Sequence, residues 1–536
     1  MWTGMMHGRE PMSKVDTAWL RMESPTNRMM ITGVMVFSNR LPLERLNAAL
    51  RARFLKYRRF TQRVRDLGTQ AFWEDDESFD LGRHVVSAQL PRPANEAALQ
   101  AYVSELASTA LDDDRPLWQF HLIEKFGQGS ALIVRMHHCY ADGMALVQVM
   151  LSLTDTDGVV RHEAPAVAAR KSADAGFLEG LFAPTVKGMG QVSGFFETAV
   201  KKVVEFGQHP QIVTEDLTAK AKSGLREVSD FARELGAALT LSDDPQTAFK
   251  GRLSADKRVA WCPPLRLDEV KIVGRALGGT VNDVLLACAA GALRSYLLAH
   301  GSDVDGLQIR ASVPVNLRKS GGTTELGNHF GLVFVPLPIG VAHPLERLIA
   351  VRDAMRELKQ SRQAMVTFGL LSALGVAPVS MQKPAFEMLS RKATLVATNV
   401  PGPSKALFLN GAAIEEMMFW VPQTGSIGLG ISLLSYNGRV HFGVVADAHL
   451  VPNPQEIVQR FAPELEKLVM LALLSDESET ITEGQIRADL RKNAAARPSR
   501  KPPKAKVQPL KSKVPNIKTP NASTRGRSRV RTGSVS

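Results

Sequence analysis

The chain has 536 residues, a length that suits two domains with sizeable cores rather than one. Hydrophobic residues make up 44% of it, which is ordinary for a globular protein. Its three cysteines, Cys139, Cys262 and Cys288, are too few for a disulfide framework and indicate a reducing compartment. No Cys–His cluster has zinc-ligand spacing, the N-terminus lacks the apolar core of a signal peptide, and no apolar run reaches about 18 residues. We therefore expect no metal site, no signal peptide and no transmembrane helix.

The net charge of +13 is a property of one end of the chain. Residues 491–536 contain 14 Lys and Arg and no acidic residue, whereas the rest of the chain has 52 basic and 53 acidic residues. This tail has almost no large apolar residue, so it is predicted to be disordered. Its charge favours an anionic surface as partner. Non-specific binding of nucleic acid is the alternative, although the tail has no aromatic residue for stacking.

Hydrophobic periodicity predicts a mixture of strands and helices in the first half of the chain. The predicted helices, whose apolar residues recur at three- and four-residue spacings, are 43–54, 97–109 and 144–151. The predicted strands, which are short apolar runs, are 31–37, 118–124 and 131–136. The last two strands are expected to form a hairpin through residues 127–129.

Between the halves, residues 154–175 are polar and Ala-rich and are predicted to be a linker, and 223–241 a helical connector. Residues 177–206 carry Val, Phe and Ala at helical spacing, flanked by lysines. Two alternatives remain open for this segment: a helix that packs on the protein, or one that lies on a membrane or lipid surface.

The second half repeats the mixture. The predicted helices are 267–276, 281–299, 344–361 and 454–474, with Thr280 or Asn282 as the cap of the second. The predicted strands are 309–318, 332–337, 393–403 and a hairpin, 427–436 and 439–446, that turns at Asn437-Gly438. The fold class is therefore α/β or α+β. We expect an N-terminal domain at 1–155, the linker region at 156–250, a C-terminal domain at 251–480 and a disordered tail at 481–536.

Residues 137–143, with the sequence HHCYADG and the pattern HHxxxDG, lie between a predicted strand and a predicted buried helix. In an extended segment neighbouring side chains point to opposite faces, so only His137 or His138 can look into a given cavity. A neutral imidazole, with a pKa near ~6.5, can accept a proton at neutral pH. Asp142 is placed to pair with a cation and fix the turn, and Gly143 lets the backbone approach a substrate. Two structural histidines and a turn are the alternative explanation.

Several motifs together resemble the bacterial wax ester synthase/acyl-CoA:diacylglycerol acyltransferase family, and the resemblance spans residues 12 to about 474. HHxxxDG alone is shared with chloramphenicol acetyltransferase-like enzymes and peptide-synthetase condensation domains. The motifs that narrow the family are Asp16-x-x-Trp19 with Glu23 and Met30, Pro116-Leu117-Trp118, Asn282-Asp283-Val284, Ser312-Val313-Pro314-Val315, Gly327-Asn328 and Asn399-Val400-Pro401-Gly402-Pro403.

The resemblance implies two chloramphenicol acetyltransferase-like domains with the active site and acyl tunnel between them. It implies that His138 takes the proton of an acceptor hydroxyl, which then attacks the thioester of acyl-CoA, with no covalent intermediate. His137 and Asp142 are expected to support the site. Cys139 is a weaker candidate as nucleophile, because its side chain would oppose that of His138 in a strand.

Substrate-binding roles are predicted for Gly143 and for Asn282, which is either an oxyanion donor from the other domain or a helix cap. Pro116, Leu117 and Trp118 are also candidates, although packing is the plainer role for them. No cofactor is expected beyond acyl-CoA as substrate. The expected acceptors are diacylglycerol or a long-chain fatty alcohol, and the expected place is the cytoplasm, peripherally on the inner face of the cell membrane or on lipid inclusions.

Two alternatives stay open at this point. The first is an acyltransferase that acts on another hydroxylated lipid or metabolite. The second is a non-catalytic protein of the lipid-inclusion surface, against which the intact HHxxxDG pattern argues.

Overall fold

The computed structural model describes residues 9–160, 241–317, 328, 330–361, 363–374, 379–423 and 425–474. Most of the predicted linker, the predicted helix at 177–206, all but the last residue of the connector at 223–241 and the basic tail lie outside these ranges. Those four predictions therefore stay predictions.

The first half alternates short strands and helices, as its periodicity predicts. Its helices are α1 (Lys14–Arg21), α2 (Leu43–Ala49, continued by a π-helical turn to Phe54), α3 (Glu96–Ser108) and α4 (Gly143–Ser152). Its strands are β1 (Arg9–Pro11), β2 (Met30–Phe37), β3 (Gln62–Asp66), β4 (Ala71–Asp75), β5 (Val85–Ser87), β6 (Trp118–Phe126) and β7 (Gly129–His137).

The second half has longer helices. They are α8 (Leu267–Ala276), α9 (Val281–Ala299), α10 (Pro344–Gln360), α11 (Gln363–Leu374), α12 (Val379–Arg391), α13 (Gln455–Val458) and α14 (Phe461–Leu474). Its strands are β8 (Lys257–Trp261), β9 (Leu265–Arg266), β10 (Ile309–Asn316), β11 (Phe330–Leu337), β12 (Leu395–Pro401), β13 (Phe408–Leu409), β14 (Ala412–Trp420), β15 (Leu429–Tyr436) and β16 (Arg439–Asp447).

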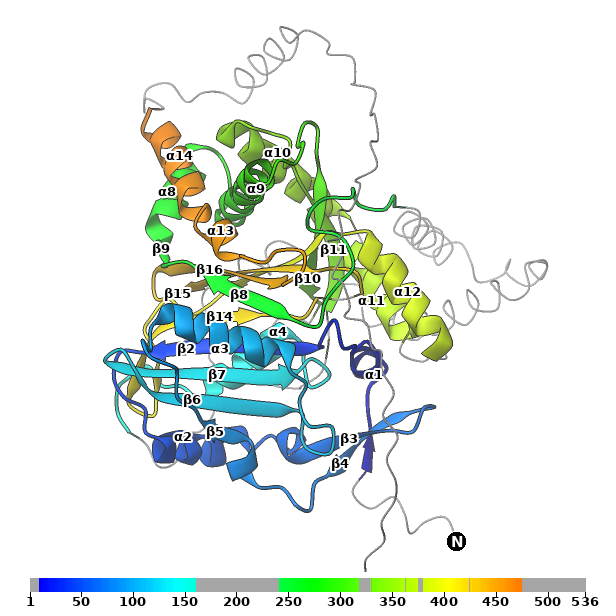
Figure 1. Cartoon of the computed structure of the whole chain (residues 1–536), viewed down its shortest axis with the longest axis vertical. Helices are drawn as coiled ribbons and strands as arrows, with labels where there is room; N and C mark the ends of the chain where they lie inside the picture. Colours follow the sequence, from blue (N-terminus) through cyan, green and yellow to red (C-terminus); the bar gives the residue numbers. More distant parts are fainter. Residues whose placement is uncertain are drawn as a thin grey trace, which may run out of the picture. The chain divides into compact units, whose positions relative to one another are not determined.

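Two large sheets organise these elements, one above the other in Figure 1. The first has the order β13-β14-β2-β7-β6-β5, so two strands from the second half complete the sheet of the first half. β14 runs antiparallel to β2, with Trp420 opposite Thr32. The domain boundaries that we predicted from the sequence, at residues 155 and 251, did not anticipate that strands of the second half join the sheet of the first half. A separate three-stranded sheet, β1-β4-β3, lies beside the first sheet.

The second sheet has the order β11-β10-β12-β15-β16-β8, with β9 paired to β16. The hairpin of β15 and β16 turns at Asn437 and Gly438, which both have positive φ, and this confirms the predicted turn. The predicted helix at 454–474 is wrong in one detail, because it is divided into α13 and α14. Pro463 lies in the first turn of α14, where its missing N–H is tolerated but cannot bond back to the preceding turn.

Helix α9 is the central helix of the second half, where α8, α10 and α14 pack around it (Figure 1). It is long and apolar enough to cross a membrane by composition alone, but 78% of its apolar window is buried within the protein. Thr280 caps α9 and forms a reciprocal capping box with Asp283. The cap is therefore Thr280, and the alternative that Asn282 caps the helix is wrong.

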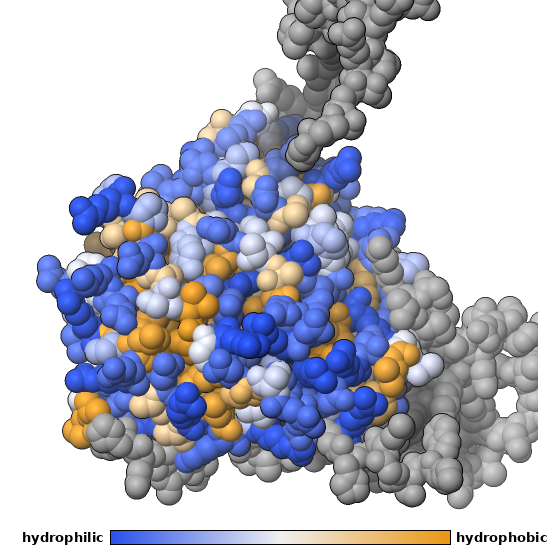
Figure 2. Space-filling view, turned by 60° about the horizontal axis from the view of Figure 1, so that its bottom comes forward, coloured by the Kyte–Doolittle hydropathy of each residue, from blue (hydrophilic) through white to orange (hydrophobic). Residues whose placement is uncertain are grey.

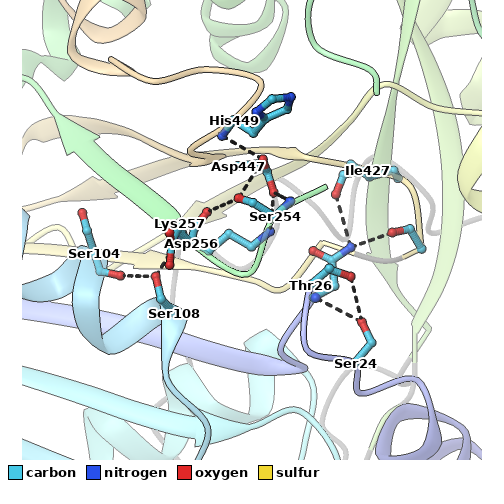
Figure 3. A network of polar contacts seen from close by, with 12 residues as sticks. Ser24, Thr26, Ser104, Ser108, Ser254, Asp256, Lys257, Ile427, Asp447 and His449 are labelled. Carbon is cyan, nitrogen blue, oxygen red and sulfur yellow. Dashed lines mark hydrogen bonds and ion pairs between the residues drawn. The ribbon is translucent and has the colours of Figure 1, made fainter. Parts of the chain in front are cut away.

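The seam between the halves is both apolar and polar. An apolar cluster joins residues of β2, β6, β7 and α3 to Val259, Trp261, Trp420 and Val445 from the second half. Beside it, the backbone N–H of Val259 donates to Ser104 Oγ of α3 at 2.8 Å. The backbone N–H of Lys257 donates to Ser108 Oγ of the same helix, also at 2.8 Å (Figure 3). The buried Lys257 ammonium in turn lies 3.2 Å from a carboxylate oxygen of Asp447. These contacts fix the two halves to each other along α3 and β8.

Candidate active site

The HHxxxDG stretch connects β7 to α4, as predicted. β7 ends at His137, so His138 already lies in the turn, and its backbone N–H donates to the carbonyl of Met29 at 2.7 Å. The strand alternation that we expected to separate the two histidines therefore does not extend to His138. Their rings nevertheless have different surroundings, because the turn directs them to different neighbours.

His138 is buried, with 4% of the residue's surface exposed. The Trp19 indole is stacked on it, with ring centroids 4.2 Å apart and planes inclined by 17°, and Phe330 lies 5.6 Å away. Burial lowers the pKa of His138 from 6.5 to about 4, although the nearby Asp142 carboxylate acts in the opposite direction. The imidazole is therefore neutral at neutral pH, the form that a general base needs.

The backbone of His138 is held from the second half of the chain. The Asn328 side-chain amide donates to the His138 carbonyl at 2.9 Å and to Asp16 Oδ1 at 2.7 Å. Asp16 Oδ1 also accepts the Asn328 backbone N–H at 3.0 Å. Asp16 is buried, and burial raises the pKa of its carboxyl. Two motifs that are about 310 residues apart in sequence thus meet at the backbone of one histidine.

His137 has a supporting role in this geometry. Its Nδ1 accepts the backbone N–H of Cys139 at 3.1 Å, which leaves the proton on Nε2. Nε2 lies 3.3 Å from a carboxylate oxygen of Glu23, which also accepts the Met29 N–H at 2.7 Å. Burial raises the pKa of Glu23, but the contacts with His137, Met29 and Arg28 together bring it below its usual value. His137 therefore braces the turn from behind.

Cys139 is a poor nucleophile here. Its thiol is fully buried, and burial raises its pKa well above the usual value. Only the thiolate attacks carbon efficiently, so a thiol that stays protonated carries no covalent step. The sequence also made Cys139 a weaker candidate for the nucleophile. The physical reason, however, is the burial of the thiol and not the alternation of side chains along a strand.

Asp142 is the N-cap of α4, where its Oδ1 accepts the backbone N–H of Ala145 at 2.9 Å. Gly143 is the first residue of the helix, and among the described residues outside its own helix and chain neighbours a Cβ there would meet only Val421, at 3.9 Å. The small residue thus leaves space on the side of the loop that follows β14. The predicted pairing of Asp142 with a cation stays a prediction.

Two substitutions of Asp142 should show whether its helix cap or its negative charge contributes to the stability of the protein. Asp142→Ala removes the cap, and we expect it to lower the free energy of unfolding by about 0.5–2 kcal/mol. Asn caps as well as Asp does, so Asp142→Asn should recover that loss in urea unfolding. An Asn variant as unstable as the Ala variant would show that the negative charge, and not the cap, stabilises the turn.

Pro116, Leu117 and Trp118 lie at the start of β6, beside the end of β7. Leu117 and Trp118 are buried; the Leu117 carbonyl accepts the His137 N–H at 2.9 Å. The Trp118 indole donates to the Phe60 carbonyl at 2.8 Å. The described contacts of this motif are therefore structural, in agreement with the packing role, and they align the end of the strand that carries the histidines.

Asn282 lies in the first turn of α9, and its Oδ1 accepts the Asn399 side-chain amide at 2.7 Å. Both are buried or half-buried and come from motifs that we named for the family resemblance. The bond fixes the Asn282 amide relative to β12. Its predicted role as oxyanion donor stays a prediction, because no described contact joins it to the HHxxxDG turn.

Four further residues belong to the site: Asp16, Trp19, Glu23 and Asn328. The sequence identified them only as parts of motifs, without a role. Each acts through a contact with a residue far away in the chain, which no local pattern predicts.

Acidification should destabilise the protein. Burial lowers the pKa values of His121, His138 and His441 from 6.5 to about 4. Between these values the unfolded chain binds protons that the folded chain does not, so stability falls as the pH decreases from 6.5 toward 4. We expect a loss on the order of 1–3 kcal/mol for each histidine, measured by thermal unfolding across this range.

The matched variant for this measurement is His441→Gln, which removes one titrating group from β16, outside the HHxxxDG turn. It should reduce the slope of stability against pH between 6.5 and 4. The pKa values of Asp16, Glu96 and Glu416 are raised by burial and act in the opposite sense at acidic pH. An unchanged slope in His441→Gln would contradict the assignment of the pH dependence to buried histidines.

Comparisons with known proteins agree with this geometry. The model of the wax ester synthase/diacylglycerol acyltransferase catalytic domain matches residues 12–285, and that of the WS/DGAT C-terminal domain matches residues 326–469. A Mycobacterium bovis protein named as a diacylglycerol O-acyltransferase is 30% identical over 487 residues, 86% of this chain and 90% of its own. O-acyltransferase WSD of Acinetobacter baylyi is 26% identical over 74% of this chain and 82% of its own.

Two solved structures show the fold. The wax ester synthase/diacylglycerol acyltransferase of Marinobacter aquaeolei superposes with a TM-score of 0.61 at 24% identity, covering 87% of this chain and all of its own. The first condensation domain of the calcium-dependent antibiotic synthetase gives a TM-score of 0.52 at 16% identity, covering 89% and 98%. These matches confirm the predicted two-domain α/β architecture.

Proposed function

The chain belongs to the wax ester synthase/diacylglycerol acyltransferase family, and from that premise we propose which reaction it performs. It transfers a long-chain acyl group from acyl-CoA to the hydroxyl of diacylglycerol or of a long-chain fatty alcohol, with His138 as the general base. The products are a triacylglycerol or a wax ester.

The observation that supports this proposal most directly is the state of His138. The ring lies in the turn between β7 and α4, is buried, and is neutral at neutral pH because burial lowers its pKa to about 4. A buried neutral imidazole can accept a hydroxyl proton. The imidazolium that results is unstable there, because the same burial disfavours its charge. The proton should therefore move on within the same catalytic cycle.

The reaction balances without a covalent enzyme intermediate. His138 accepts the proton of the acceptor hydroxyl as its oxygen attacks the thioester carbon. The tetrahedral oxyanion then collapses, the carbon–sulfur bond breaks, and the proton on His138 is transferred to the departing thiolate of CoA. We propose Asn282 as a donor to that oxyanion and Gly143 as the point where the backbone comes close to the substrate.

The acceptor is open between two classes, because the related proteins carry names of both kinds. An assay with palmitoyl-CoA should compare diacylglycerol, hexadecanol and no acceptor, and measure free CoA together with the labelled lipid. Ester formation with either acceptor supports the proposal. Transfer only to another hydroxylated metabolite would favour the alternative acyltransferase, and no transfer to any hydroxyl would favour a non-catalytic lipid-surface protein.

We further propose that the protein acts peripherally at the cytoplasmic face of a membrane or at a lipid inclusion. Its lipid substrates require such a surface, and one face of the described structure shows hydrophobic patches between hydrophilic side chains (Figure 2). At the end of α14, Met470, Leu473 and Leu474 are exposed. The 14 positive charges of residues 491–536 would add attraction to anionic headgroups.

Deleting residues 491–536 should weaken binding to anionic vesicles but spare turnover with soluble, short-chain substrates. Each charge near the surface contributes about 1 kcal/mol, and the attraction decays within a Debye length of about 8 Å at physiological salt. Co-sedimentation of full-length and truncated protein at low and high salt measures this. Equal and salt-independent binding by both proteins would exclude the tail as the anchor.

A further inference from the structure

Helix α1 presents two buried side chains, Asp16 and Trp19, on one face. They are three residues apart, so they lie about one turn from each other. Only 6% of Asp16 and 4% of Trp19 is exposed. Ser13 caps the helix by accepting the N–H of Asp16 at 3.1 Å, and α11 packs against it. The two side chains are therefore held on a rigid element.

Both of these side chains act on His138, but on different parts of it. Trp19 covers the ring face to face at 4.2 Å. Asp16 binds Asn328, whose amide in turn holds the His138 carbonyl at 2.9 Å. The ring and the backbone of one residue are thus fixed from one helix. Phe330 lies 5.5 Å from Trp19 and 5.6 Å from His138 and brings the second half of the chain into the same contact.

The orientation of the His138 ring needs such a support. Histidine bases are commonly oriented by a hydrogen bond from their second ring nitrogen to a carboxylate or carbonyl. Within the described residues, no hydrogen bond of ordinary geometry reaches the buried His138 Nδ1, although the Asn328 side chain lies close enough to the ring to favour its protonated form. A ring without that bond is free to rotate about its Cα–Cβ and Cβ–Cγ bonds unless packing prevents it. The stacked Trp19 indole, with the Phe330 ring beside it, supplies that packing.

We propose that Trp19 and Asp16 are positioning residues for His138: Trp19 sets the ring plane and excludes water, and Asp16 fixes the backbone through Asn328. This inference rests on the proposed role of His138 as the base. It assigns a function to the Asp16-x-x-Trp19 motif and explains why Asn328, from the second half, must meet the first half before the base is ordered.

Trp19 is tested with Trp19→Ala and Trp19→Phe, and with Trp261→Phe as control. Trp261 is another buried tryptophan, which lies against Trp420, so Trp261→Phe makes the same change in side-chain volume as Trp19→Phe at a different position. We expect Trp19→Ala to lower kcat by about tenfold to a hundredfold with little change in KM. Trp19→Phe should restore most of the loss, and Trp261→Phe should keep the wild-type kcat.

A pH profile separates orientation from simple destabilisation. Removing the indole admits water to the ring, so the pKa of His138 should rise from about 4 toward 6.5, and the acidic limb of kcat/KM should move with it. The titratable groups that act on the ring are Asp142 and His137, and Asp16 binds the Asn328 side chain that holds the His138 carbonyl; all three are unchanged in Trp19→Ala. A profile identical to the wild type, with kcat within twofold, would overturn the role of Trp19.

Asp16 and Asn328 are tested as a pair. If they act through one contact, Asp16→Ala and Asn328→Ala should each lower kcat, and the double variant should be no slower than the slower single variant. Independent, multiplicative losses would overturn the clamp. Circular dichroism and thermal unfolding of each variant establish that the folded protein is compared.

A readout without substrate distinguishes this inference from the proposed function. The imidazole signals of isotope-labelled histidine, assigned by comparison with His138→Ala, report the pKa of His138 directly. A higher pKa in Trp19→Ala supports the positioning role even if no acyl transfer is found, and an unchanged pKa contradicts it even if the enzyme is an acyltransferase.

Discussion

His138→Ala should abolish acyl transfer while the protein stays folded. The loss of a general base typically lowers the rate by about 10²–10⁴-fold, and the buried site offers no solvent base in its place. The substitution also removes the partner of the Trp19 indole, so a moderate loss of stability is expected. Turnover of palmitoyl-CoA with the preferred acceptor, measured as ester formed, checks this prediction.

The matched control is His441→Ala. His441 is buried on β16, and burial lowers its pKa to about 4 as for His138, but it lies in the second sheet, near Tyr436. It should lose stability but keep turnover at a temperature where it is folded. If folded His138→Ala retained more than about a tenth of the wild-type turnover, His138 would not be the base.

Local signals predicted most of the fold. The helix at 281–299 and the hairpin at Asn437-Gly438 appear where the pattern placed them, because apolar periodicity and turn chemistry act over a few residues. The sequence left two candidates for the N-cap of α9, Thr280 and Asn282. The structure shows that Thr280 is the cap. Thr280 and Asp283 satisfy each other there, which leaves Asn282 for a contact with Asn399.

Long-range pairing could not be predicted. β14 has the sequence AAIEEMMFW without a regular alternation, and nothing in it specifies β2, nearly 400 residues earlier, as its neighbour. The contacts of Asp16 and Trp19 with Asn328 and His138 have the same origin, since each becomes visible only when two distant segments meet. The motifs predicted which residues belong to the site, but only the fold shows which residues they contact.

The second large effect should come from the buried ion pair of Arg347 in α10 and Glu464 in α14. Their side chains are 3% and 4% exposed. Arg347 also donates to the carbonyls of Ala287 at 3.1 Å and Val341 at 2.9 Å. The pair passes beside Gly291 in the middle of α9, where a Cβ would collide with both charged groups. A glycine that weakens the helix is thus explained by the space that the pair requires.

We expect Glu464→Ala to lower the free energy of unfolding by about 3–5 kcal/mol, because it leaves the Arg347 guanidinium buried without a counter-charge. Urea unfolding measures the loss. The control is Glu456→Ala, which removes a half-exposed partner of His300 at 3.2 Å and should cost less than about 1 kcal/mol. Arg347→Met combined with Glu464→Leu should recover most of the loss, since apolar residues of similar size often replace a buried ion pair without penalty. A double variant as unstable as Glu464→Ala would show that the hydrogen bonds of Arg347 to the backbone, and not the uncompensated charge, hold α9, α10 and α14 together.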